Sequence, residues 1–193
     1  YKRQSGRFWF SLTTLNLIFK MIGESEADMD RKQIDNVVCD WECLAIIAHR
    51  ARAAGQRLVA TSGAFDLFHD AHALYLEEAA RCGDMLFVGV DSDDLVARYK
   101  GARLPICGQD VRLKVVAAQS SVDCAVIMHE WPAFIRLVSP QVVVVSPTTK
   151  VKDAFDRRLT IESAGAEMVS VSSRSVTHTS GLIKVILERY GPK

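Results

Sequence analysis

The segment LVATSGAFDLFHDAH, residues 58–72, decides the fold of this chain. Residues 58–60 are apolar and, with the β-branched Thr61, typical of a buried strand. Gly63 opens a turn, and the positions from Asp70 onward predict a helix. The start of a helix has unpaired backbone N–H groups and a partial positive charge, and it therefore attracts anions. His69 and His72 lie three positions apart and face the same way at this start. The segment thus predicts a phosphate-binding turn between a strand and a helix.

Short apolar runs continue to alternate with amphipathic segments after this unit. Further strands are expected at residues 85–90, 124–128, 142–145 and 168–171, with helices at 70–82, 91–99, 110–120, 132–138, 152–165 and 179–189. This alternation predicts an α/β fold, a Rossmann-like doubly wound sheet of five parallel strands. In such sheets, ligands bind at the carboxyl ends of the strands where the strand order reverses.

The chain before this region has a different composition. Residues 8–22 are apolar at helical spacing but shorter than the ~20 residues of a membrane-spanning helix. We expect an N-terminal helical extension that packs on the domain or on a partner subunit, with a membrane contact as the alternative. An acidic linker follows this helix, and the two together make up residues 1–33. Residues 34–193 are expected to form the main domain, which begins with a helix over residues 34–54.

Composition limits the class of protein. The 24 Lys and Arg residues nearly balance the 23 Asp and Glu residues, so no net attraction to nucleic acid or anionic lipid is expected. The five cysteines are scattered in apolar segments, which is typical of reduced thiols and indicates a cytoplasmic protein. Cys39, Cys43 and His49 fit one helix face better than a zinc site, which needs about four ligands. No metal-binding residue is therefore predicted.

Several ordered segments resemble the cytidylyltransferase-like nucleotidyltransferases, a family with a His-x-Gly-His signature. The first unit carries the matching residues Gly63, Phe65, Asp66, His69 and His72. The other matches are Val88-Gly89-Val90-Asp91-Ser92-Asp93, Lys100-Gly101, Arg103 with Pro105, Asp110-Val111-Arg112, and Arg174-Ser175-Val176-Thr177-His178-Thr179-Ser180. Within the family the chain resembles first the heptose 1-phosphate adenylyltransferases and second the glycerol-3-phosphate cytidylyltransferases.

The resemblance implies a reaction in which a phosphate oxygen of a sugar phosphate or polyol phosphate attacks the α-phosphorus of ATP or CTP. Pyrophosphate leaves, and AMP transfer is expected over CMP transfer because the heptose enzymes are the nearer resemblance. Mg²⁺ is implied as a cofactor that binds mainly through the nucleotide phosphates. The implied partners are the nucleotide, the phosphorylated acceptor and a second copy of the chain in a homodimer.

The resemblance also implies roles for individual residues. The catalytic group is His69, His72 and Lys100. The nucleotide-binding group is Gly63, Ala64, Phe65, Asp66, Arg174, Thr179 and Ser180, and the substrate-binding group is Asp93, Arg103 and Arg112. The residues alone leave other interpretations open. The histidines and the two hydroxyl residues fit helix caps, Asp93 and Arg112 fit a structural ion pair, and Lys100 and Arg103 fit solvated loop charges.

The chain departs from the family pattern at two places. Ala71 stands where the family has a glycine between the histidines, and residues 146–150 replace a loop that contains glycine and acidic residues. An alanine in a left-handed conformation costs ~1–2 kcal/mol, but in the right-handed first turn of a helix it costs nothing. Two hypotheses follow: an active nucleotidyltransferase, and a nucleotide-binding or scaffold domain of the same fold with impaired catalysis.

Overall fold

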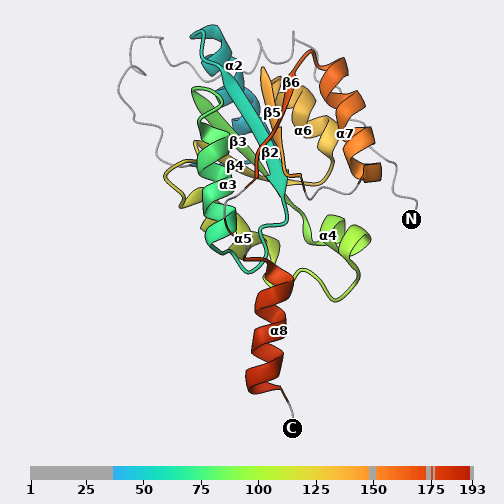
Figure 1. Ribbon diagram of the computed structural model, residues 1–193. Coiled ribbons are helices and arrows are strands. Elements are labelled where there is room, and N and C mark those ends of the chain that lie inside the picture. The colour runs from blue at the N-terminus through green and yellow to red at the C-terminus, as the bar shows by residue number, and fades with distance from the viewer. Residues whose placement is uncertain (1–36, 148–150, 173–174, 176, 192–193) are drawn as a thin grey trace, which may run out of the picture. The chain divides into compact units, whose positions relative to one another are not determined.

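Strands and helices alternate along the chain in a computed structural model of the protein (Figure 1). The model describes residues 37–147, 151–172, 175 and 177–191, without the side chains of Val37 and of residues 151–156. The predicted N-terminal helix, the acidic linker and the domain boundary after residue 33 lie outside the described residues. They therefore stay predictions.

The described residues form a parallel sheet of six strands in the order β1-β4-β3-β2-β5-β6. Five of them are the predicted strands, β2 (Leu58–Gly63), β3 (Met85–Asp91), β4 (Cys124–Met128), β5 (Val142–Val145) and β6 (Glu167–Ser170). The chain runs outward from β2 through β3 to β4 and then returns to β5 on the other side of β2. The strand order therefore reverses beside β2, and the predicted phosphate-binding turn follows this strand. The predicted Rossmann-like fold is confirmed.

The helix predicted over residues 34–54 is wrong at its start. Val37–Val38 form the short strand β1, which pairs with the beginning of β4, and α2 covers only Trp41–Ala53. Adjacent β-branched residues favour an extended backbone, because their side chains restrict χ1. Asp40 then starts the helix as its N-cap, and its carboxylate accepts a hydrogen bond from the Cys43 N–H at 2.7 Å.

Helices cover both faces of the sheet. One layer contains α2, α6 (Trp131–Val138) and α7 (Val151–Ser163), and the other contains α3 (Asp70–Ala80) and α5 (Gln109–Ala117) (Figure 1). Side chains along each strand alternate between the layers. Both faces of the central strands are thus buried in apolar contacts, which fix the carboxyl edge where the turns begin.

Two helices extend beyond this edge. The short helix α4 (Asp93–Lys100) follows β3, and α8 (Thr179–Tyr190) comes last in the described chain. No residue of α8 is buried, and the apolar side chains Val185, Ile186 and Leu187 are exposed. Among the described helices, none has the length and apolar character that crossing a membrane requires.

Candidate active site

The turn between β2 and α3 has a sharply folded backbone. Phe65 and Leu67 have φ angles of 50° and 44°, in the left-handed region that non-glycine residues rarely adopt. The ring of Phe65 is buried against Gly63, where a Cβ atom would lie 3.3 Å from the ring. A side chain at position 63 would press on this ring, so glycine favours the tight packing inside the turn. Its predicted role in the approach of a nucleotide stays a prediction.

Asp66 holds this turn against the loop of residues 101–108. Its carboxylate accepts hydrogen bonds from the backbone N–H groups of Ile106 at 2.7 Å, Cys107 at 2.8 Å and Leu67 at 3.1 Å. The residue is only 3% exposed. Each bond joins a charged acceptor to a backbone donor, an arrangement stronger than a neutral hydrogen bond. Asp66 therefore positions the turn, and its predicted nucleotide contact stays a prediction.

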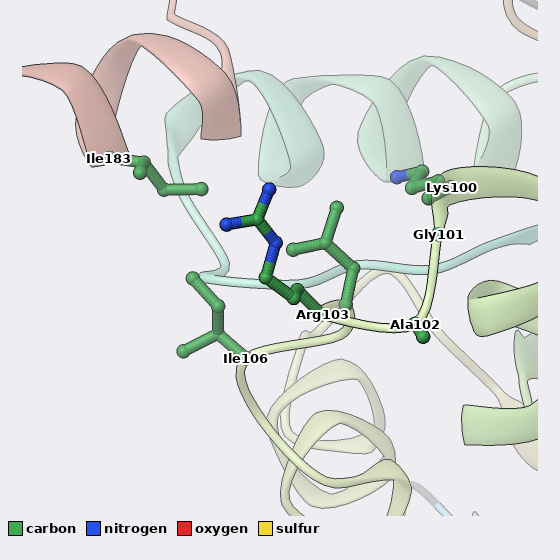
Figure 2. A pocket seen from close by; sticks show the side chains of 7 residues that line it. Lys100, Gly101, Ala102, Arg103, Ile106 and Ile183 are labelled. Carbon is green, nitrogen blue, oxygen red and sulfur yellow. The ribbon is translucent and has the colours of Figure 1, made fainter.

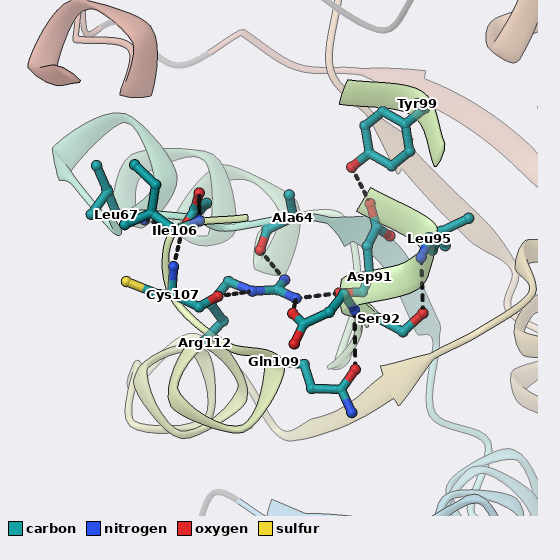
Figure 3. A network of polar contacts seen from close by, with 12 residues as sticks. Ala64, Leu67, Asp91, Ser92, Leu95, Tyr99, Ile106, Cys107, Gln109 and Arg112 are labelled. Atoms are coloured by element: carbon teal, nitrogen blue, oxygen red, sulfur yellow. Dashed lines mark hydrogen bonds and ion pairs between the residues drawn. The ribbon is translucent and has the colours of Figure 1, made fainter. Parts of the chain in front are cut away.

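The buried side chain of Arg112, on α5, connects the turn after β2 to the loop of residues 101–108. Its guanidinium donates to the backbone carbonyls of Cys107 at 2.9 Å and Asp91 at 2.7 Å, and to that of Ala64 (Figure 3). It also forms an ion pair with Asp93 at 2.8 Å. These bonds join the ends of β2 and β3. The structural ion pair is therefore present, while substrate binding by Asp93 and Arg112 stays a prediction.

His69 and His72 lie face to face at the start of α3. Their ring centroids are 3.9 Å apart and the ring planes differ by 22°. Burial, and then the nearby His69 and Lys100, lower the pKa of His72 to about 4. Burial also lowers the pKa of His69. Both rings are therefore neutral near pH 7, and each has one N–H donor and one acceptor nitrogen.

Each imidazole also has a buried nitrogen without a hydrogen-bond partner. These atoms are Nδ1 of His69 and Nδ1 of His72. The carboxylate oxygen Oδ1 of Asp70 lies 3.8 Å from His69 Nδ1, which is beyond hydrogen-bond distance. Although His69 is the N-cap residue of α3, its side chain makes no capping bond. Buried polar atoms without partners are rare in folded proteins. The side chain of His69 therefore does not cap α3, and the two Nδ1 atoms keep unused hydrogen-bonding capacity.

The start of α8 meets the start of α3 beside these rings. Thr179 Oγ1 donates to the backbone carbonyl of Asp66 at 3.0 Å and lies 3.5 Å from His69 Nε2. His178 is the N-cap residue of α8, and Ser180 is exposed. Two helix N-termini with partial positive charge thus converge on the imidazoles. The predicted nucleotide contacts of Thr179 and Ser180 stay predictions.

A pocket of about 520 Å³ opens between the loop of residues 100–106 and α8 (Figure 2). Lys100 and Arg103 supply its positive charge, and the Arg103 side chain extends between Lys100 and Ile183 (Figure 2). The charge of Lys100 also acts on His72, whose pKa it helps to lower. The structure thus brings Lys100 near the histidines. The predicted residue Arg174 lies outside the described residues.

Ala71 lies in the first turn of α3, with a buried side chain. Its φ is not among the positive values of the described chain, so the backbone is right-handed. Alanine therefore causes no backbone strain at this position. This departure from the family pattern is compatible with the geometry of the turn.

Sequence reasoning missed a second polar group at the same edge. Arg157 of α7 donates to Ser62 Oγ at 3.2 Å and lies over the ring of Trp131, 4.5 Å from its centre. Tyr99 Oη donates to Asp91 Oδ2 at 2.5 Å (Figure 3). Asp91 belongs to a matched segment, but no local motif marks Tyr99, Trp131 or Arg157. An arginine on an amphipathic helix is normally exposed to solvent, so the sequence carried no signal for this position.

The donors at the histidine site suit an anion better than a cation. Among the described residues, no group of three or more His, Cys, Asp or Glu side chains could hold a metal ion. The carboxylates of Asp66 and Asp93 already bond to protein donors. Neutral imidazoles, Lys100 and helix N-termini fit phosphate oxygens. These residues are compatible with Mg²⁺ held mainly by nucleotide phosphates, which the family resemblance implies and which stays a prediction.

Comparisons with known proteins identify the family of this chain. The model of the family described as cytidylyltransferase-like matches residues 60–186, which include the turn, both histidines and the start of α8. The chain belongs to the cytidylyltransferase-like family. The resemblance stated from the sequence motifs is therefore confirmed, and the chain has the fold of the nucleotidyltransferases.

Two relatives of this cytidylyltransferase-like chain are called bifunctional protein HldE. The protein from Pelobacter propionicus is 32% identical over 158 residues, which cover 81% of the chain and 32% of that protein. The protein from Geotalea uraniireducens is 33% identical over 183 residues, or 94% of the chain and 36% of that protein. The chain thus spans about one third of the length of these relatives.

A solved structure shares the fold of this cytidylyltransferase-like chain. The lipopolysaccharide core biosynthesis protein from Thermoplasma volcanium is 25% identical, with a TM-score of 0.55. The match covers 63% of this chain and 100% of the solved chain. The likeness thus extends over the whole of the solved chain.

Proposed function

We propose that this domain transfers a nucleotidyl group, AMP in preference to CMP, from a nucleoside triphosphate to a sugar phosphate or polyol phosphate. The observation that carries the proposal is the pair of neutral imidazoles with unpartnered nitrogens beside two converging helix N-termini. Phosphate oxygens fit such donors. The resemblance to heptose 1-phosphate adenylyltransferases and the similarity to HldE proteins support AMP and a sugar phosphate as the two reactants.

In the proposed reaction, a phosphate oxygen of the acceptor attacks the α-phosphorus of the nucleotide. A new P–O bond forms, the bond from the α-phosphorus to its bridging oxygen breaks, and pyrophosphate leaves with the electron pair. Because two anions must approach each other, positioning and charge neutralisation provide most of the catalysis.

Different residues of the site provide the positioning and the charge neutralisation. His69 and His72 donate N–H groups to phosphate oxygens, and Lys100 neutralises charge on the departing pyrophosphate. Asp66 and Arg112 hold the two loops that carry these groups. Mg²⁺ bound to the phosphates supplies further charge neutralisation.

The test measures pyrophosphate release from ATP or CTP with Mg²⁺ and mannose 1-phosphate, heptose 1-phosphate or glycerol 3-phosphate. We expect ATP with a sugar 1-phosphate to react fastest. Substitution of His69→Ala or His72→Ala should lower kcat/KM by roughly 100-fold or more, since each removes a donor to the developing charge. The control His49→Ala lies on α2, in the opposite layer, and should leave kcat/KM unchanged. A folded protein that releases no pyrophosphate with any pair would reject the proposal.

The alternative is a nucleotide-binding or scaffold domain with impaired catalysis. The sequence of residues 146–150 favours it, because this loop lacks the glycine and acidic residues of the family. The alternative predicts that calorimetry detects ATP binding while the same acceptors yield no pyrophosphate. The homodimer and the partner contact of residues 8–22 are further proposals, tested by the molecular mass in solution with and without residues 1–23.

A further inference from the structure

The last helix, α8, is joined to the domain by polar contacts at its start. No residue of α8 is buried, and the helix extends beyond the carboxyl edge of the sheet (Figure 1). Burial of apolar side chains therefore contributes little to its position. Thr179, in the first turn, donates to the backbone carbonyl of Asp66 at 3.0 Å. Just before the helix, Ser175 Oγ donates to Asp70 Oδ2 at 2.6 Å.

Asp70 is the first residue of α3 and directly follows His69. Its carboxylate accepts the Ser175 hydroxyl, and Ser175 Oγ in turn accepts a hydrogen bond from the Thr177 N–H at 3.0 Å. Hydrogen bonds from the side chains of Ser175 and then Thr177 lower the pKa of Asp70, so this carboxyl group is ionised near neutral pH. We call these bonds the Asp70 contact. It holds the chain that leads into α8 against the start of α3.

A general preference for acidic residues at helix starts does not account for this contact. The negative charge of Asp70 complements the partial positive charge of the helix N-terminus, but Asp94 in the first turn of α4 does the same. Only Asp70 of the two also bonds to Ser175 and Thr177 within the described part of the chain. Its charge moreover opposes the approach of phosphate groups to the adjacent His69. Asp70 therefore has a structural use that outweighs this repulsion.

The start of α8 lies beside the histidine site, next to the Asp70 contact. Thr179 Oγ1 is 3.5 Å from His69 Nε2. Burial lowers the pKa of His69, the charge of Asp70 raises it and that of His178 lowers it, so both neighbouring charges act on this ring. Because α8 has no buried residue, loss of the Asp70 contact favours molecules in which the start of α8 is displaced. Such molecules lack one of the two helix N-termini of the anion site.

We infer that Asp70 is a positioning residue for the nucleotide, which holds the start of α8 beside the histidines through Ser175 and Thr177. The inference rests on the proposed function, because it assigns this role within the proposed triphosphate site. Asp70 itself does not touch the nucleotide. The apparent dissociation constant equals the intrinsic value divided by the fraction of molecules in the competent arrangement. Removal of the carboxylate therefore weakens nucleotide binding, although the loss of a negative charge alone would strengthen it.

The first test is a calorimetric titration of the full chain with ATP and Mg²⁺. Asp70→Ala removes the Asp70 contact, and we expect the dissociation constant to rise roughly five- to tenfold. Asp70→Asn keeps an acceptor oxygen for the Ser175 hydroxyl and should restore most of the affinity. Asp94→Ala, the matched control in the first turn of α4, leaves the affinity unchanged. The inference is overturned if Asp70→Ala binds ATP as tightly as the wild type or more tightly, or if the wild type binds no ATP.

A double-mutant cycle tests whether Asp70 acts through Ser175. Ser175→Ala removes the donor and keeps the carboxylate, and we expect it to weaken ATP binding about threefold or more. Combined with Asp70→Ala, it should add less than about twofold, because the shared bond is already lost. Fully additive losses would show that Asp70 acts independently of the chain before α8, which overturns the inference.

Pyrophosphate release separates positioning from a loss of stability. Saturating ATP favours the competent arrangement, so Asp70→Ala should raise the KM for ATP and leave kcat within about threefold of the wild type. A destabilised protein with fewer folded molecules instead shows a lower kcat at an unchanged KM, and this result would reject the positioning role. Weaker ATP binding in Asp70→Ala that Asp70→Asn restores, in a protein that releases no pyrophosphate, supports the positioning role and rejects the transfer.

Discussion

Arg112 and Arg157 lie on opposite faces of the same carboxyl edge, and their surroundings differ. Arg112 is 2% exposed, bonds to three backbone carbonyls and forms an ion pair with Asp93. Arg157 is half-buried, and within the described part of the chain it contacts one hydroxyl group and one aromatic ring. A guanidinium surrounded by protein acceptors serves the fold, whereas one with few acceptors keeps unused N–H donors. The comparison separates side chains whose hydrogen-bonding capacity is filled by the protein from side chains that keep some of it.

The same distinction applies around the histidines. Asp66 is a motif residue, yet its carboxylate is occupied by backbone N–H groups of the neighbouring loop. His69 and His72 belong to the same motif, but each keeps a buried nitrogen without a partner. Membership of a motif therefore does not by itself identify a ligand contact. The remaining hydrogen-bonding capacity of each side chain is the better guide.

The largest expected effect on stability comes from Arg112→Met. This substitution leaves Asp93 and buried carbonyl groups without their donor. The Asp93 side chain is 46% exposed, so most of the loss comes from the buried carbonyl groups, and we expect the free energy of unfolding to fall by about 2–4 kcal/mol. Arg157→Met should lower it by about 1 kcal/mol or less, because no ion pair is lost. Urea denaturation followed by circular dichroism measures both, and equal losses would show that the two arginines do not differ in role.

The next effect is a pH dependence from His72. Its pKa is about 4 in the folded protein, mainly because of burial and then because of His69 and Lys100, against 6.5 for an unperturbed imidazole. Between these values the unfolded chain binds more protons, so the free energy of unfolding falls as the pH falls through this window. Relative to His72→Gln, the wild type should lose roughly 3 kcal/mol between pH 7 and pH 4. Urea denaturation across this range provides the measurement.

The comparison with His72→Gln isolates this ring from the carboxylates that titrate in the same range. Asp66 and Asp70 act against the lowered pKa of His72, but they are present in both proteins. Parallel pH profiles would mean that His72 is not held neutral by burial. His72 would then be charged at about pH 5–6 in the folded protein, and it would not be the neutral hydrogen-bond donor of the proposed site.

Much of the fold could be predicted because it depends on local patterns. Apolar runs mark five strands, and Gly63 followed by the histidines marks the turn at the switch point. The strand β1 could not be predicted in this way, because two residues become a strand only by pairing with β4. Asp40 did carry a local signal, since an N-cap residue indicates where α2 begins.

The site was less predictable than the fold. Residue types left two interpretations for Arg112, and only the folded geometry shows a guanidinium surrounded by carbonyls and Asp93. Asp91, Trp131 and Arg157 come from different elements, and tertiary packing alone brings them to one edge. A sequence motif depends on local chain geometry. It therefore does not show which atoms remain without hydrogen-bond partners once the chain has packed.

The smallest expected effect tests Ala71, which lies between the two histidines in the sequence and belongs to the first turn of α3. Because its backbone is right-handed and its side chain is buried, Ala71→Gly should lower the free energy of unfolding by about 1 kcal/mol and leave kcat/KM unchanged. Urea denaturation and pyrophosphate release measure the two quantities. Ala73→Gly, in the same helix, is the matched control and should lose similar stability. Pyrophosphate release that appears only in Ala71→Gly would instead mean that the methyl group obstructs the nucleotide, which is what the impaired-domain hypothesis requires.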